Sequence, residues 1–121
     1  MAEHRRFPGS VYRRGSEPDA RFSLANERTF LAWVSAGLAL ISVGVGLGSL
    51  GLGLQPGFRT AAAVVLVLGG IACPVQAWFG WARVETALRE QRPLPSPTLA
   101  PALAAVVALA GLFVLLGMVV P

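Results

Sequence analysis

The residues of this sequence best suited to chemistry are arginines at the ends of long apolar segments. Arg28 precedes one such segment, Arg83 follows another, and Arg21 lies further upstream. A guanidinium group can make two parallel hydrogen bonds to a phosphate-like anion, so arginines gathered where helices enter a membrane suit such ligands. In a symmetric oligomer they form a ring that attracts anions and repels cations. The same side chains suit anionic lipid headgroups, and the spacing does not distinguish the two ligands.

Small and hydroxylated residues follow Arg28 as a stripe along one face of the expected helix. They recur at alternating intervals of three and four, the spacing of a single helix face. Small residues permit close packing against another helix, which is the interpretation that the pattern alone favours. The alternative is a narrow pathway lined by hydroxyl groups, with Arg28 at its mouth. The stripe consists of Ala32, Ser35, Ala39, Ser42, Gly46, Ser49 and Gly53.

No combination of residues in the sequence suggests catalysis or metal binding. The one histidine, His4, lies in a polar segment, whereas the one cysteine, Cys73, lies in an apolar segment. There is no lysine to complete a phosphate-binding loop of the GxxxxGK[ST] type. No carboxylate lies within the apolar segments, where a proton relay would need one. We therefore expect no catalytic residues, no metal site and no cofactor, and a protein that is not an enzyme.

Three long uncharged segments must position these residues. The chain has 121 residues, of which 55% are apolar and 13% charged, whereas soluble domains have about 25% charged residues. Uncharged runs cover residues 30–54, 60–82 and 98–120, each long enough to cross a hydrocarbon core of about 30 Å as a helix. The sequence predicts an all-α integral membrane protein with three transmembrane helices. A short interfacial helix is expected to begin at Asp19 or Ser23, since either side chain can cap free N–H groups.

The charges divide the chain into two regions and predict its orientation. Residues 1–18 are expected to be a flexible polar tail, and residues 19–120 a three-helix membrane domain with a polar loop at 83–97. Nine of the ten arginines lie in the N-terminal segment and this loop. The positive-inside rule therefore predicts a cytoplasmic N-terminus and an external C-terminus in a plasma membrane. The net charge of +4 flanks apolar spans, which favours anionic lipid headgroups as a partner and argues against nucleic acid.

A ten-residue motif at the start of the first span resembles the signature of the YidH-like family. The motif reads Leu24-Ala25-Asn26-Glu27-Arg28-Thr29-Phe30-Leu31-Ala32-Trp33. These are small three-span proteins of the bacterial inner membrane, long described as a domain of unknown function. The motif is also similar to the membrane domain of the eukaryotic vacuolar transporter chaperone complex, which makes and translocates polyphosphate. The likeness extends over residues 19–120 and implies a bacterial plasma-membrane protein that forms a homo-oligomer.

The resemblance also implies roles for individual residues. Arg28 matches the motif arginine, which in the chaperone complex is associated with the cytosolic side of the channel. Asn26 and Glu27 match the neighbouring polar pair, and the first helices are implied to surround a polyanion path. Trp33 is followed here by Val34-Ser35-Ala36, whereas many bacterial members have an arginine two residues after the tryptophan.

Two functions therefore remain open at the level of sequence. The first is an oligomeric channel or transport component for phosphate-like anions, in which arginines concentrate the anion and serine hydroxyls line the path. The second is a structural or assembly subunit that packs beside other membrane proteins, which the glycine-rich helix faces favour.

Overall fold

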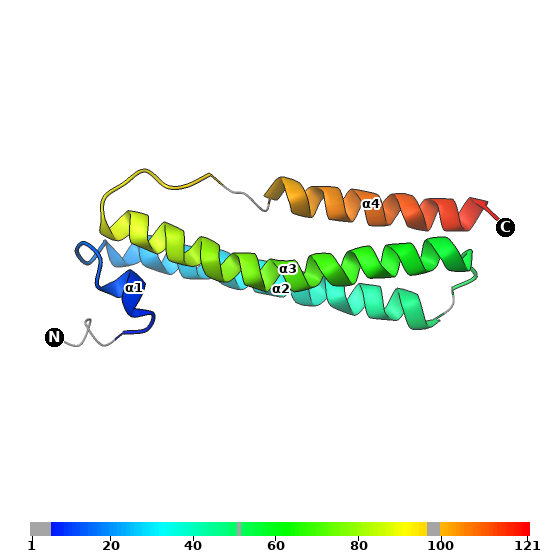
Figure 1. Ribbon diagram of the computed structural model, residues 1–121, viewed down its shortest axis with the longest axis horizontal. Coiled ribbons are helices and arrows are strands. Elements are labelled where there is room, and N and C mark those ends of the chain that lie inside the picture. Colours follow the sequence, from blue (N-terminus) through cyan, green and yellow to red (C-terminus); the bar gives the residue numbers. More distant parts are fainter. Residues whose placement is uncertain (1–5, 51, 97–99) are drawn as a thin grey trace.

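The computed structural model consists of helices, with no strand among the residues that it describes (Figure 1). Those residues are 6–50, 52–96 and 100–121. The helices are α1 (Gly9–Tyr12), α2 (Ala20–Leu50), α3 (Pro56–Arg89) and α4 (Ala100–Val119). The last three are long and apolar enough to cross a membrane, which confirms the predicted class. The first five residues of the predicted tail and the predicted start of the third span, at 98 and 99, lie outside the described residues.

The three long helices form a hairpin with one helix packed on its side. Helices α2 and α3 lie side by side along their length, and α4 lies along α3 and not along α2 (Figure 1). The buried apolar cluster comprises Leu47, Ala62, Leu66 and Ala110, one or more from each long helix. The backbone N–H of Gln55, in the α2–α3 turn, donates to the Gly117 carbonyl at 3.0 Å, which ties the turn to the end of α4.

Glycines bring α2 and α3 into close contact. A Cβ atom on Gly70 would lie 2.7 Å from the Gly37 carbonyl oxygen and 2.5 Å from Cγ1 of Ile41. One on Gly44 would lie 3.0 Å from the Ala63 carbonyl oxygen. Small residues permit such approach, and dispersion contacts then hold the helices together. Glycines other than those of the predicted stripe therefore form this interface.

The first long helix begins at Ala20, where a short interfacial helix was expected, whereas the first span was expected from residue 30. The Asp19 carboxylate accepts a hydrogen bond from the Arg21 backbone N–H at 2.9 Å, so Asp19 is the N-cap of α2. From there α2 continues into the first apolar segment without a break. The predicted short N-terminal helix is present, but it is α1, which precedes the expected position.

The second long helix continues beyond the expected boundary. Residues 83–89 were predicted to be loop, but α3 ends only at Arg89. Gln91 has a φ of 55°, and the Arg92 N–H donates to the Ala87 carbonyl at 2.9 Å, which is a Schellman termination. The helix remains ordered past the apolar segment because Glu85 and Arg89 are buried against other parts of the chain.

The two arginine-rich segments lie at the same end of the molecule. The N-terminal segment packs against the end of α3, next to the linker that leads to α4, and the C-terminus lies at the other end (Figure 1). This placement agrees with three spans. The side of the membrane that each end faces stays a prediction.

Candidate functional site

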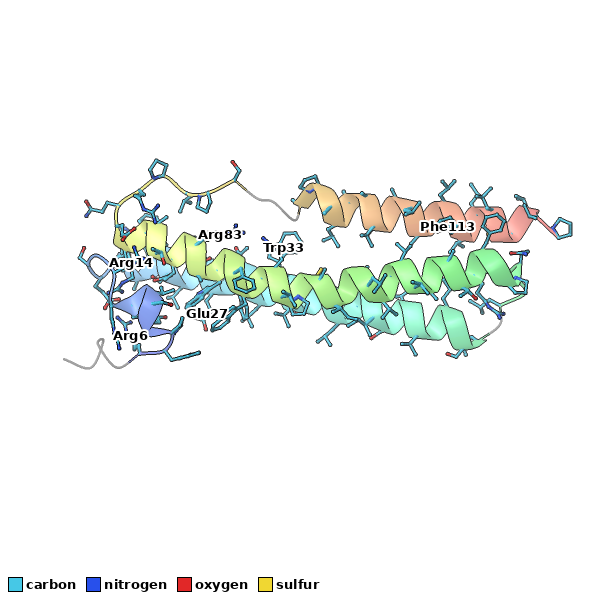
Figure 2. All side chains as sticks on the ribbon, in the orientation of Figure 1. Arg6, Arg14, Glu27, Trp33, Arg83 and Phe113 are labelled. Atoms are coloured by element: carbon cyan, nitrogen blue, oxygen red, sulfur yellow. The ribbon has the colours of Figure 1, made fainter. Side chains whose placement is uncertain are left out.

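Three arginines line a groove at the basic end of the bundle. We call it the arginine groove, defined by Arg14 from the N-terminal segment, Arg83 from α3 and Arg92 from the linker after α3. Its volume is about 790 Å³, and its remaining lining includes Ser10, Val11 and Thr86 and the side chains of other α3 and linker residues. Figure 2 shows Arg14 near the N-terminal end and Arg83 on the side of α3 that the linker passes. The groove thus depends on three segments of the chain.

The groove carries more positive than negative charge. Glu90 pairs with Arg14 at 3.3 Å and with Arg92 at 2.8 Å, so one carboxylate serves two guanidinium groups. Arg83 has no ion pair with any residue that the structure describes. Arg83 is an exposed residue and therefore available to an anion.

A second, smaller cavity of about 160 Å³ lies beside Arg83 between α2, α3 and the linker. Its walls include the aromatic side chains of Phe30, Trp33 and Trp81 as well as Asn26. Figure 2 shows Trp33 and Arg83 on the same side of the hairpin, with Glu27 on the other. Arg83 lines both spaces, so it stands between an arginine-rich groove and an aromatic cavity.

The other two arginines predicted from the sequence are not in this site. Arg28 is exposed on α2 and lines neither cavity. The Arg21 side chain is 84% exposed, and Arg21 pairs with Asp19 at 2.9 Å on the first turn of α2. The structure therefore groups Arg83 with Arg14 and Arg92, and not with Arg28 or Arg21.

The two polar residues of the motif have different surroundings. Asn26 is buried, and its Nδ2 donates to the Trp81 carbonyl at 3.0 Å and to Oε1 of Glu85 at 3.4 Å. Glu85 is only 2% exposed, and its Oε2 accepts a hydrogen bond from the Ser23 hydroxyl at 2.7 Å. Glu27, in contrast, is exposed. Asn26 thus joins α2 to α3 through a buried carboxylate.

The predicted stripe lies on the outer surface of α2, except for Gly53, because α2 ends at Leu50 and not at residue 54 as expected. Ser35, Ala39, Ser42 and Ser49 are exposed and Gly46 is half-buried. Ser42 donates to the Leu38 carbonyl at 2.8 Å, and Ser49 likewise donates within its own helix. Within one chain the stripe therefore lines neither described cavity and leaves a surface open to lipid or to another helix.

A buried arginine near the end of α3 was not singled out from the sequence. The side chain of Arg89 is 3% exposed, and it donates to the carbonyls of Arg14 at 2.8 Å and Tyr12 at 3.0 Å. It also pairs with Glu17 at 3.3 Å. Glu85 and Arg89 are four residues apart, so they share one face of a helix. This spacing would have been a signal for the pair if the second helix had been predicted to continue to Arg89.

Charges and burial alter the titration of groups in the N-terminal segment. Burial raises the pKa of Tyr12, and the nearby Glu85 carboxylate adds to the effect. A hydrogen bond from Arg6 holds the pKa of Glu17 below its usual range. The Tyr12 ring lies 4.3 Å from the Arg6 guanidinium carbon and 5.5 Å from that of Arg89, so two cations contact its π system.

Comparisons with known proteins give one family and several bacterial relatives. The family described as "Domain of unknown function (DUF202)" matches residues 21–87. The inner membrane protein YidH of Escherichia coli K12 is 38% identical over 88 residues, which cover 70% of this chain and 75% of that protein. The uncharacterized protein Rv2272 of Mycobacterium tuberculosis H37Rv is 39% identical over 80 residues, 65% of this chain and 66% of its own length. No solved structure was found to match.

The family match covers only part of the arginine groove. Of the three groove arginines, the matched segment includes Arg83, begins after Arg14 and ends before Arg92. Outside the groove, it includes Asn26 and Glu85 but not Arg89. The contact between α2 and α3 thus falls within the shared segment. The N-terminal and linker arginines lie outside it.

Proposed function

Since this chain belongs to the DUF202 family, we propose that it is a small multi-pass membrane protein that captures phosphate-like anions in its arginine groove and transports them as an oligomer. One observation carries this proposal: arginines from three segments line one groove, and Arg83 has no ion pair among the described residues. Arginine forks bind phosphate oxygens two at a time, which favours this anion class.

We place the arginine groove on the cytoplasmic side of the plasma membrane. The positive-inside rule assigns this side to the end with the N-terminal segment and the linker after α3. The C-terminus then lies outside. Phosphate-like anions would reach Arg83 from the cytoplasm, near the boundary between water and hydrocarbon, where a lower effective dielectric strengthens their attraction to cations.

The transport step requires more than one copy of the chain. The serine-containing stripe faces outward on α2, so only a neighbouring chain can enclose it as a path. Arg28 lies two helical turns before Ser35 and would stand at the basic end of that path. The motif's resemblance to the membrane domain of the vacuolar transporter chaperone complex supports a polyanion as the transported species.

Binding of tripolyphosphate to the purified protein in mild detergent tests the groove. We expect wild-type binding by calorimetry and, for Arg83→Gln, a loss of about 1.5–3 kcal/mol, as for hydrogen bonds to charged groups, or roughly tenfold or more in Kd. Arg21→Gln is the matched control, because Arg21 is exposed and outside the groove. Equal affinities for Arg83→Gln and wild type would exclude the groove as the binding site.

Flux into proteoliposomes tests transport separately. Wild-type protein should release or take up phosphate or polyphosphate faster than empty liposomes, and Arg28→Gln should reduce flux while leaving tripolyphosphate affinity unchanged. Binding without flux above the empty-liposome rate would rule out transport by this protein alone.

The second candidate function is a structural or assembly subunit for other membrane proteins. The observation in its favour is the exposed stripe of small residues on α2, which another helix could approach closely. Mass spectrometry in mild detergent distinguishes the two functions. A stable homo-oligomer favours transport, whereas recovery only with a different membrane protein favours the assembly role.

A further inference from the structure

We propose that residues 6–18, here called the N-terminal strap, form a detachable wall of the arginine groove, so that strap docking and anion binding stabilise each other. This inference rests on the proposed anion binding and concerns its regulation. The strap supplies Ser10, Val11 and Arg14 to the groove. If the strap detaches, the groove loses this wall and one of its three arginines.

The strap is held mainly through Arg89. The Arg89 side chain donates to two strap carbonyls, at Tyr12 and Arg14, and pairs with the Glu17 carboxylate. The Arg89 backbone carbonyl accepts a hydrogen bond from the Ser16 N–H at 2.9 Å. Arg89, at the end of α3, thus forms hydrogen bonds with backbone groups of the strap and an ion pair with a strap carboxylate.

Docking also requires a particular backbone conformation at Gly15. Its φ is +50°, and a Cβ atom there would lie 1.9 Å from the Arg89 carbonyl oxygen. A side chain at this position therefore cannot coexist with the docked strap, because the blocking atom belongs to the backbone of α3. The residue offers a way to detach the strap without removing any charge.

The strap buries little apolar surface. Val11 is its only buried residue in the described part, Tyr12 is half-buried against Trp81, and Phe7 is mostly exposed although it stacks on Trp78. Segments with little buried apolar surface open locally at low cost. The polar contacts to Arg89 therefore decide whether the strap stays docked.

Arg14 couples docking to the ligand. Its backbone carbonyl is bound by Arg89, while its side chain lines the groove with Arg83 and Arg92. Docking brings a third guanidinium group near two others, and Glu90 is the carboxylate described between Arg14 and Arg92. An anion in the groove reduces the repulsion among the three guanidinium groups that Glu90 does not neutralise, and so favours the docked strap. By thermodynamic linkage, docking must strengthen anion binding by the same factor.

Hydrogen–deuterium exchange of the full chain in nanodiscs, with and without sodium tripolyphosphate, tests the coupling. In the wild-type protein the ligand should slow exchange of strap amides, including that of Ser16, by about fivefold or more, a typical coupling factor. Gly15→Ala should exchange rapidly at these amides with or without ligand and bind tripolyphosphate more weakly. Arg14→Gln should keep slow exchange without ligand but lose the ligand's effect. Arg21→Gln is the control and should behave as wild type.

The possible outcomes separate this inference from the proposed function. If wild type binds tripolyphosphate but strap exchange does not change and Gly15→Ala binds equally well, the strap is a fixed structural element and only this inference is overturned. If wild type does not bind tripolyphosphate, the groove is not an anion site and both proposals fail. Unchanged exchange of α2 and α3 amides in Gly15→Ala shows that a loss of binding is not caused by general unfolding.

Discussion

Replacing Gly70 with alanine should weaken the hairpin of α2 and α3. The added Cβ would lie 2.5 Å from Cγ1 of Ile41, 2.7 Å from the Gly37 carbonyl oxygen and 3.0 Å from the Ile41 backbone nitrogen. Two of these atoms are backbone atoms of α2, so the whole helix has to move. Overpacking of this kind costs about 1–3 kcal/mol, and the better helix propensity of alanine offsets up to about 1 kcal/mol.

With the overpacking cost in the upper part of this range, about 2–3 kcal/mol, because backbone atoms must move, the net loss should be about 1–2 kcal/mol, or roughly five- to thirtyfold in the unfolding equilibrium. The assay is a titration with SDS in mild detergent micelles, followed by the fluorescence of the three tryptophans. All three lie on α2 or α3, so their signal reports separation of the hairpin. Because helices persist in detergent, fluorescence is more informative here than helix content.

Gly80→Ala is the matched control for Gly70→Ala. Gly80 lies in the same helix, but a Cβ atom there has nothing within 4 Å. This variant should be as stable as wild type or more stable, by up to about 1 kcal/mol, because alanine favours helix. Equal stability of the two variants would refute the conclusion that backbone contact at Gly70 sets the distance between α2 and α3.

The remaining predictions concern other contacts of the described chain. Asn26→Ala should destabilise the hairpin by about 1–3 kcal/mol, since the buried Glu85 carboxylate loses a donor; stability equal to wild type in the SDS titration would contradict this. The Arg21 hydrogen bond lowers the pKa of Asp19, so the N-cap should be fully effective above pH about 4 and be lost as pH falls through the lowered value. Protection of the Arg21 amide, taken relative to the intrinsic exchange rate at each pH, should fall accordingly in wild type and stay constant in Asp19→Asn. Buried Cys73 should react with maleimide only after SDS addition; equal reaction rates before and after would show that the hairpin is open.

Much of the fold could be predicted from the sequence. Three apolar segments indicated three helices of spanning length, and Asp19, one of the two expected helix caps, precedes α2. The end of α3 could not be predicted, because hydropathy treats Glu85 and Arg89 as solvated charges. In the structure both are buried against α2 and the strap, which keeps the helix intact beyond the apolar segment.

Less of the candidate site could be predicted. Arg83 was singled out and lines the groove, but its partners Arg14 and Arg92 were not. Sequence spacing relates residues on one helix, and it carries little information about which side chains of distant segments meet. Arg28 and Arg83 flank different spans at one end of the bundle, yet helix rotation places only Arg83 in the groove.

By itself, the sequence determined the three helices of spanning length and the concentration of arginines at one end. The reason is that hydrocarbon satisfies no backbone polar group and solvates no charge, so long uncharged segments must form helices and the charges must lie outside them. Only the tertiary structure decided which arginines share a groove and that the strap docks on Arg89. Those contacts depend on helix rotation, on the close approach at glycines and on the burial of a few polar groups, all of which arise from packing between segments far apart in the chain.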